Sequence, residues 1–228
     1  MAAKRKLFRT PRRRSSTKRR RTRRRLRLPK HVVPDSKIVR LRYVTTVARD
    51  PGSGAALSYI FRANSLFDPD FTSIGHQPLG YDQWAQFYDH YTVLGSKMKV
   101  TFLSQSADPK LGTAICGILL KDNGTPLTNP EHIMEATNSG WKILTNATAS
   151  QKITVTKNFS SRKFFGLKDV SDNRDEVGAG VTTNPSEDAY FHCFVAPTQA
   201  DQNLPAITLI CEIDFLAKFT ERKTLAQS

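Results

Sequence analysis

The sequence has few cysteines and no long apolar run, and each shortage excludes a class of protein. Its 228 residues include three cysteines, Cys116, Cys193 and Cys211, which lie far apart in apolar stretches. This pattern predicts buried thiols in a reducing compartment rather than a disulfide framework, and no CxxC spacing predicts a metal site. The longest apolar runs, such as residues 113–120, are much shorter than the roughly 20 residues needed to cross a bilayer. We therefore expect no membrane insertion. No apolar segment follows the basic N-terminus, so we also expect no secretory signal.

Catalytic signatures are also missing. The sequence contains no Gly-rich phosphate loop, GxSxG or HExxH motif. His192 stands beside Cys193, but adjacent residues of a strand point to opposite faces, so they do not form a nucleophile–base pair. Asp68 and Asp70, or Asp172 and Asp175, could bind a cation, but nothing else in the sequence supports a metal site. We predict no catalytic residue, no metal, no cofactor and no enzymatic activity.

Acidic residues are absent from the N-terminal arm, which we define as residues 1–34. The arm contains sixteen Lys and Arg residues, whereas residues 35–228 contain 19 basic and 20 acidic residues. The arm also lacks apolar periodicity, and charge of one sign at this density repels itself, so we expect it to be disordered on its own. The chain is thus divided into a basic arm and a nearly neutral domain, residues 35–228.

The composition of the arm indicates its partner. Arginine contacts phosphates with two hydrogen bonds, and such an arm displaces counterions in a sequence-independent way. A solvated tail rarely needs so many cations, and a membrane tether usually adds an acyl site or an apolar helix face. We predict nucleic acid as the partner of the arm, and the basic clusters at residues 18–21 and 23–25 are also typical of nuclear import signals. The binding residues in the arm would be Arg5, Arg9, Arg12, Arg13, Arg14, Lys18, Arg19, Arg20, Arg21, Arg23, Arg24, Arg25, Arg27 and Lys30.

The domain contains eight segments with β-type composition, separated by Pro, Gly, Asn and Asp. They span residues 37–49, 57–63, 90–104, 112–121, 141–145, 150–158, 188–196 and 206–219. Eight short strands with irregular loops predict an all-β jelly roll or another β-sandwich. Two short helices are expected, one near residues 81–88 with Asp82 as N-cap and one near 129–136 with Asn129 as N-cap. Residues 159–187 are expected to form a projecting loop.

Alternation within three segments predicts a charged sheet face. In a jelly roll the first, last and third strands are neighbours, in that order. Their outward side chains would then be Arg40 and Arg42, Glu212 and Asp214, and Lys97 and Lys99. One interpretation is a ladder of ion pairs between strands. The other is a basic inner surface on which Arg40, Arg42, Lys97 and Lys99 bind nucleic acid.

The block GHQPLGYDQWAQFYDHYTVLGSKMKVTF, residues 75–102, resembles the capsid proteins of small circular Rep-encoding single-stranded DNA viruses, the circovirus-like group. Residues 158–166, NFSSRKFFG, are similar to a segment after a later strand in that family. The resemblance implies an eight-stranded viral jelly roll made of two packed antiparallel four-stranded sheets. It also implies a T=1 shell of sixty copies, packaged single-stranded DNA, traffic through the host nucleus and a cell-surface attachment factor.

Other interpretations remain open. The five aromatic residues of the block are expected to pack in the core or between subunits rather than stack on bases: Tyr81, Trp84, Phe87, Tyr88 and Tyr91. A basic arm contacts RNA phosphates as readily as DNA phosphates, so a coat protein that packages single-stranded RNA is the first alternative. A cellular β-sandwich with a basic nucleic-acid-binding tail is the second.

Overall fold

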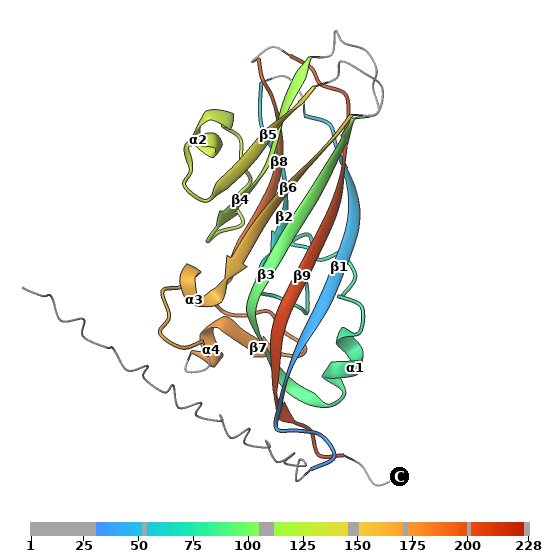
Figure 1. Cartoon of the computed structure of the whole chain (residues 1–228), viewed down its shortest axis with the longest axis vertical. Coiled ribbons are helices and arrows are strands. Elements are labelled where there is room, and N and C mark those ends of the chain that lie inside the picture. The colour runs from blue at the N-terminus through green and yellow to red at the C-terminus, as the bar shows by residue number, and fades with distance from the viewer. Residues whose placement is uncertain are drawn as a thin grey trace, which may run out of the picture.

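Two antiparallel sheets pack against each other and make up most of the protein (Figure 1). The structure is a computed structural model that describes residues 31–51, 54–104, 112–145, 151–170, 173–199 and 202–225. The front sheet has the order β1 (Ser36–Arg49), β9 (Ile207–Arg222), β3 (Tyr88–Ser104) and β6 (Gln151–Ser160). The back sheet has the order β2 (Leu57–Arg62), β8 (Tyr190–Pro197), β4 (Thr113–Lys121) and β5 (Ser139–Thr145).

The order of the strands identifies the fold. Strands β1 and β3 flank β9 in the front sheet, and β2 and β4 flank β8 in the back sheet. This interleaving of early and late strands in two packed antiparallel sheets is the jelly roll. The predicted fold is confirmed, and each of the eight predicted segments coincides with a strand to within three residues.

The core lies between the two sheets and follows the predicted alternation. On β1 the side chains of Leu41 and Tyr43 are buried, while those of Arg40 and Arg42 are exposed. The inward residues of β9 and β3 are buried in the same way, because each strand turns every second side chain to the core. All three cysteines are free and buried, as expected of small apolar side chains.

Both predicted helices form, but only one of them begins at the predicted capping residue. Helix α2 (Pro130–Glu135) begins as predicted, because the side chain of Asn129 accepts hydrogen bonds from two backbone N–H groups. Helix α1 (Tyr81–Ala85) is shorter than predicted, and Asp82 is not its cap. Gly80 precedes this helix at φ 86°, a conformation that glycine adopts without strain. No helix among the described residues is long and apolar enough to cross a membrane.

Residues 159–187 are not the projecting loop that the sequence predicted. They contain helix α3 (Ser161–Phe164), helix α4 (Arg174–Val177) and strand β7 (Gly178–Gly180). Strand β7 pairs with β3 at the end of the front sheet, and α3 lies beside β6 (Figure 1). Val170, Val177 and Ala179 are buried, because the segment folds back on the sandwich.

The outer face of the back sheet carries a second apolar cluster. Ile115 and Leu119 of β4 and Phe194 and Ala196 of β8 point away from the main core. Helix α2 lies against this face, and its Ile133 is 1% exposed. The back sheet is therefore apolar on both faces.

Candidate nucleic-acid interface

The outer face of the front sheet carries charged side chains from three neighbouring strands. The register places Arg42 of β1 opposite Asp214 of β9, and Asp214 opposite Lys97 of β3. It also places Glu212 of β9 opposite Lys99 of β3. The predicted order of charges across this face is confirmed.

Two ion pairs join these strands. The Arg42 guanidinium donates from Nε to Asp214 Oδ1 at 2.6 Å and from Nη2 to Oδ2 at 3.1 Å. This contact with Asp214 raises the pKa of Arg42 and favours its charged form. Lys99 Nζ donates to Glu212 Oε1 at 2.8 Å. The interpretation of the face as a cross-strand ion ladder is therefore confirmed for these two pairs.

The other two predicted cations of this face form no ion pair within the part of the chain that the structure describes. Arg40 lies opposite Leu216 rather than an acid. Lys97 lies opposite Asp214, whose two carboxylate oxygens accept from Arg42. Within the described part of the chain, neither cation has a carboxylate at ion-pair distance. The predicted binding residues of the arm, from Arg5 to Lys30, lie outside the described residues.

A β-bulge interrupts the register between β3 and β9 at Val93 and Gly95. A hollow of about 720 Å³ lies on the sheet at this point, and its lining includes Arg40, Lys97 and Asn158. Sequence reasoning missed the hollow, because period-two alternation does not predict a bulge. The available signal was the glycine inside a strand, which often marks one.

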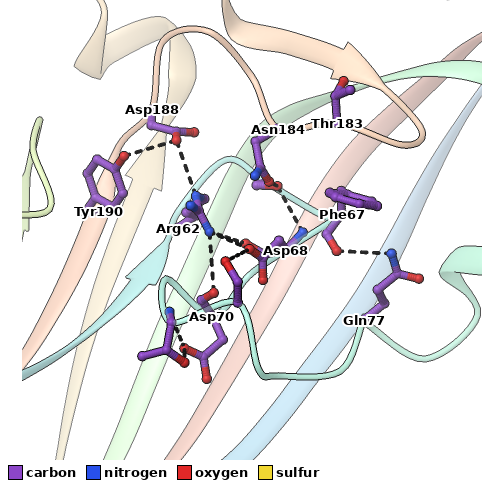
Figure 2. A network of polar contacts seen from close by, with 12 residues as sticks. Arg62, Phe67, Asp68, Asp70, Gln77, Thr183, Asn184, Asp188 and Tyr190 are labelled. Atoms are coloured by element: carbon purple, nitrogen blue, oxygen red, sulfur yellow. Dashed lines mark hydrogen bonds and ion pairs between the residues drawn. The ribbon is translucent and has the colours of Figure 1, made fainter.

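A second feature is the loop between β2 and α1, which a largely buried polar network fixes in place (Figure 2). Arg62, at the end of β2, donates to Asp68 Oδ2 at 2.9 Å and to Asp188 Oδ2 at 3.4 Å. The Tyr59 hydroxyl donates to Asp70 Oδ2 at 2.5 Å. Burial raises the pKa of Asp188. Asp68 and Asp70, which were considered as cation ligands, are thus engaged in contacts within the chain.

The fixed loop exposes two apolar side chains. Ile74 is 85% exposed and Leu79 is 88% exposed. The backbone N–H of Leu79 donates to the Arg42 carbonyl at 3.3 Å, and His76 Nε2 lies 3.0 Å from the Val44 carbonyl oxygen. The loop is therefore attached to β1, and its apolar side chains face solvent from a fixed position.

The predicted aromatic cluster packs in the core. Four of its rings lie around Phe219 of β9, with centroid distances of 6.0–6.4 Å: Tyr81, Trp84, Tyr88 and Tyr91. The fifth residue, Phe87, is 39% exposed. Packing rather than base stacking is confirmed for the four. Their helix-like spacing was misleading, because the last two lie on β3.

His192 and Cys193 do not face each other. Cys193 belongs to the core between the sheets, where burial raises the pKa of its thiol. His192 points to the other side of β8, and its Nε2 lies 2.8 Å from the Asn123 carbonyl oxygen. Burial lowers the pKa of His192. The described residues include no group of three or more His, Cys, Asp or Glu side chains that could hold a metal ion.

No protein-family model and no curated protein matches the sequence. Among solved structures, the chain is similar to the empty head of turnip yellow mosaic virus, with 10% identity, a TM-score of 0.45, and 88% of this chain and 89% of that chain covered. It is also similar to the capsid protein in the 60-mer BFDV structure, with 9% identity, a TM-score of 0.46, and 85% and 97% covered. The structure of Desmodium yellow mottle tymovirus is similar as well, with 10% identity, a TM-score of 0.40, and 88% of this chain and 97% of that chain covered. The TM-scores are low, so the fold is assigned from the sheet order itself.

Proposed function

We propose that the protein is a viral coat protein that assembles into a closed shell and packages single-stranded nucleic acid through its basic arm. One observation carries the proposal, namely the separation of charge between the two parts of the chain. Sixteen basic residues and no acid lie in residues 1–34, whereas residues 35–228 have 19 basic and 20 acidic residues. A nearly neutral jelly roll can pack against copies of itself, while the arm neutralises phosphates.

The front sheet adds a second basic surface to the arm. The proposed binding residues of the domain, Arg40, Arg42, Lys97 and Lys99, all lie on its outer face, with two carboxylates between them. A face of mixed charge binds a polyanion more weakly than the arm does. We therefore assign most of the affinity to the arm and place the front sheet toward the packaged polymer.

Assembly requires surfaces that bind a second copy of the chain. The loop that holds Ile74 and Leu79 is a candidate, because its polar network keeps both exposed apolar side chains in place before any contact forms. Preorganised apolar side chains lose little conformational entropy when a partner covers them. We propose that this loop contacts a neighbouring subunit in the shell.

The resemblance of residues 75–102 to circovirus-like capsid proteins supports the finer part of the proposal. A T=1 shell of sixty copies, single-stranded DNA as cargo, and assembly in the host nucleus with import receptors follow from it. Attachment of the virion to a cell-surface factor follows too. Sixty arms bring on the order of a thousand positive charges into one shell, which matches a polymer of similar nucleotide count.

The principal alternative is the same shell with single-stranded RNA inside. Phosphate contacts in the arm do not distinguish the two polymers, since they read no base. A cellular β-sandwich module with a basic tail is the other alternative, and it would form monomers or small oligomers. Electron microscopy of the purified protein separates shell from module, and digestion of the co-purified polymer with DNase or RNase separates DNA from RNA.

The test uses the full chain with five of the sixteen positive charges removed from its arm. Replacing five arginines by glutamine, Arg19, Arg20, Arg21, Arg23 and Arg24, should reduce the nucleic acid recovered per particle or the number of closed shells. The matched control removes five exposed charges from the domain: Lys37, Lys152, Arg162, Lys163 and Lys168, each to Gln. Equal nucleic-acid content in wild type, arm variant and control would contradict the proposal that the arm holds the cargo.

A further inference from the structure

The four cations of the front sheet have unequal freedom to bind an anion. Arg42 and Lys99 are held by carboxylates at 2.6 Å and 2.8 Å, whereas Arg40 and Lys97 have no acidic partner within the described residues. In an ion-paired cation the carboxylate takes up some of the donors and repels an incoming phosphate, whereas a cation without an acidic partner offers all of its donors. The free pair is therefore the better candidate for a specific contact.

The free pair borders one hollow. Strand β9 separates Arg40 of β1 from Lys97 of β3, and the two residues are offset by two positions along the strands, because Arg40 lies opposite Leu216 and Lys97 opposite Asp214. Strand spacing and rise put their backbones roughly 12 Å apart. Extended Arg and Lys side chains span that separation, so both head groups can reach a single anion between them. The hollow measures about 720 Å³, within the range of roughly 300–1,000 Å³ typical of small-molecule sites.

The floor and walls of the hollow fit the rest of a nucleotide. Leu216 is 36% exposed and forms an apolar floor together with Leu94, next to Gly95, which has no side chain to fill the space. A Cβ at Gly95 would lie 2.9 Å from the Phe159 carbonyl oxygen, so a larger residue does not fit there. Asn158 stands exposed on the β6 side. Its amide offers both a donor and an acceptor to the edge of any base.

The ion ladder prepares this site. Asp214 lies in the wall of the hollow and would repel a phosphate if its charge were unbalanced. Arg42 neutralises it through two hydrogen bonds, which leaves an excess of positive charge from Arg40 and Lys97. The ladder thus has a role beyond joining strands, because it removes the negative charge from the lining of the hollow.

We propose that the hollow binds one nucleotide of the packaged single strand, with its phosphate between Arg40 and Lys97 and its base or sugar over Leu216 and beside Asn158. The proposal rests on the proposed packaging function and deepens it. The lining offers apolar contact and no exposed aromatic ring, since Phe159 and Phe215 are buried. The site therefore binds without base stacking and with little preference for one base.

The test is photo-crosslinking of the full-length protein to a short single-stranded deoxyoligonucleotide that contains 5-bromouracil, followed by mass spectrometry of the crosslinked peptides. We expect crosslinks in the arm and in two stretches of the hollow, residues 94–97 and 158–160. The double variant Arg40→Gln with Lys97→Gln should lower the hollow crosslinks by about tenfold, because it removes two charge-assisted contacts. Asn158→Ala should lower them as well, since the base loses its polar partner.

The control variant Lys163→Gln with Lys168→Gln removes the same charge from exposed positions outside the hollow and should change neither set of crosslinks. Crosslinks in the arm alone would overturn the nucleotide site and leave the packaging function intact. Hollow crosslinks that persist in the double variant would overturn the phosphate contacts. Absence of crosslinks in both regions, with no co-purified nucleic acid, would instead contradict the packaging function.

Discussion

The two outer faces of the sandwich differ in what they carry. The back face has an apolar cluster that α2 covers, whereas the front face has charged side chains that remain at least partly exposed. An apolar face must be covered for the chain to be stable, so the back face is committed to folding. The front face contributes little burial and is therefore available to a ligand. Substitutions on the two faces should separate stability from binding.

The largest effect is expected on the back face. Phe194 is fully buried under α2, and Phe194→Ala should lower the free energy of unfolding by about 3–5 kcal/mol, the usual cost of removing a buried aromatic ring. Denaturant unfolding measures this loss. Trp141→Ala is the matched control, because Trp141 lies on β5 of the same sheet but is 43% exposed. If Phe194→Ala lowered the free energy of unfolding no more than Trp141→Ala does, Phe194 would not be buried under α2 as described.

Much of the fold could be predicted from the sequence because it is encoded by alternation. Buried and exposed residues alternate along β1, β3 and β9, and the faces of all three strands were predicted from this period. Strand β7 was missed because Gly-Ala-Gly has no alternation to detect. The start of α1 was misassigned because its first turn follows Gly80 at positive φ instead of a side-chain cap.

Of the candidate interface, only the contacts between neighbouring strands could be predicted from the sequence. The pairs Arg42–Asp214 and Lys99–Glu212 follow once β1, β9 and β3 are placed in jelly-roll order. The hollow at Gly95 depends on a bulge, and the loop network depends on contacts such as that of Arg62 with Asp188, 126 residues later. Contacts at this separation are set by tertiary packing and have no local sequence pattern.

A smaller effect on stability is expected when the pH is lowered, and it comes from His192 on the outer face of the back sheet. The buried Nδ1 of His192 has no hydrogen-bond partner among the described residues, and burial lowers the pKa of this imidazole in the folded state. The unfolded chain therefore binds a proton at His192 more readily than the folded chain does. Stability from this group is fully present above the ordinary histidine pKa of about 6.5 and is lost as the pH falls below it.

The variant His192→Gln isolates this contribution. Glutamine can donate to the Asn123 carbonyl oxygen but does not titrate. The free energy of unfolding of the wild type should therefore fall more steeply between about pH 7 and pH 5 than that of the variant. His90 and the carboxylates are common to both proteins, so their contributions cancel in the difference. Parallel curves would mean that the folded protein accepts the proton at His192 without cost.

The smallest effect is expected on the front face, where the Lys99–Glu212 pair is partly exposed. The side chains are 45% and 24% exposed, and solvent screening limits such pairs to about 0.2–1 kcal/mol. A double-mutant cycle with Lys99→Gln and Glu212→Gln should give a coupling energy in this range, and added salt should reduce it. A coupling near zero would mean that the Lys99–Glu212 pair does not stabilise the folded protein.

Lys97 and Lys99 provide the sharpest contrast within one strand. Lys97 and Lys99 both point outward from β3, two residues apart, but only Lys99 has an acidic partner among the described residues. Lys99→Gln should therefore lower stability slightly and leave nucleic-acid binding at the hollow almost unchanged. Lys97→Gln should do the reverse, because it breaks no ion pair among the described residues and removes one proposed phosphate ligand. Equal losses of crosslinking in the two variants would mean that this face acts through its total charge rather than through the hollow. The front sheet would then be a diffuse electrostatic surface, without a nucleotide site.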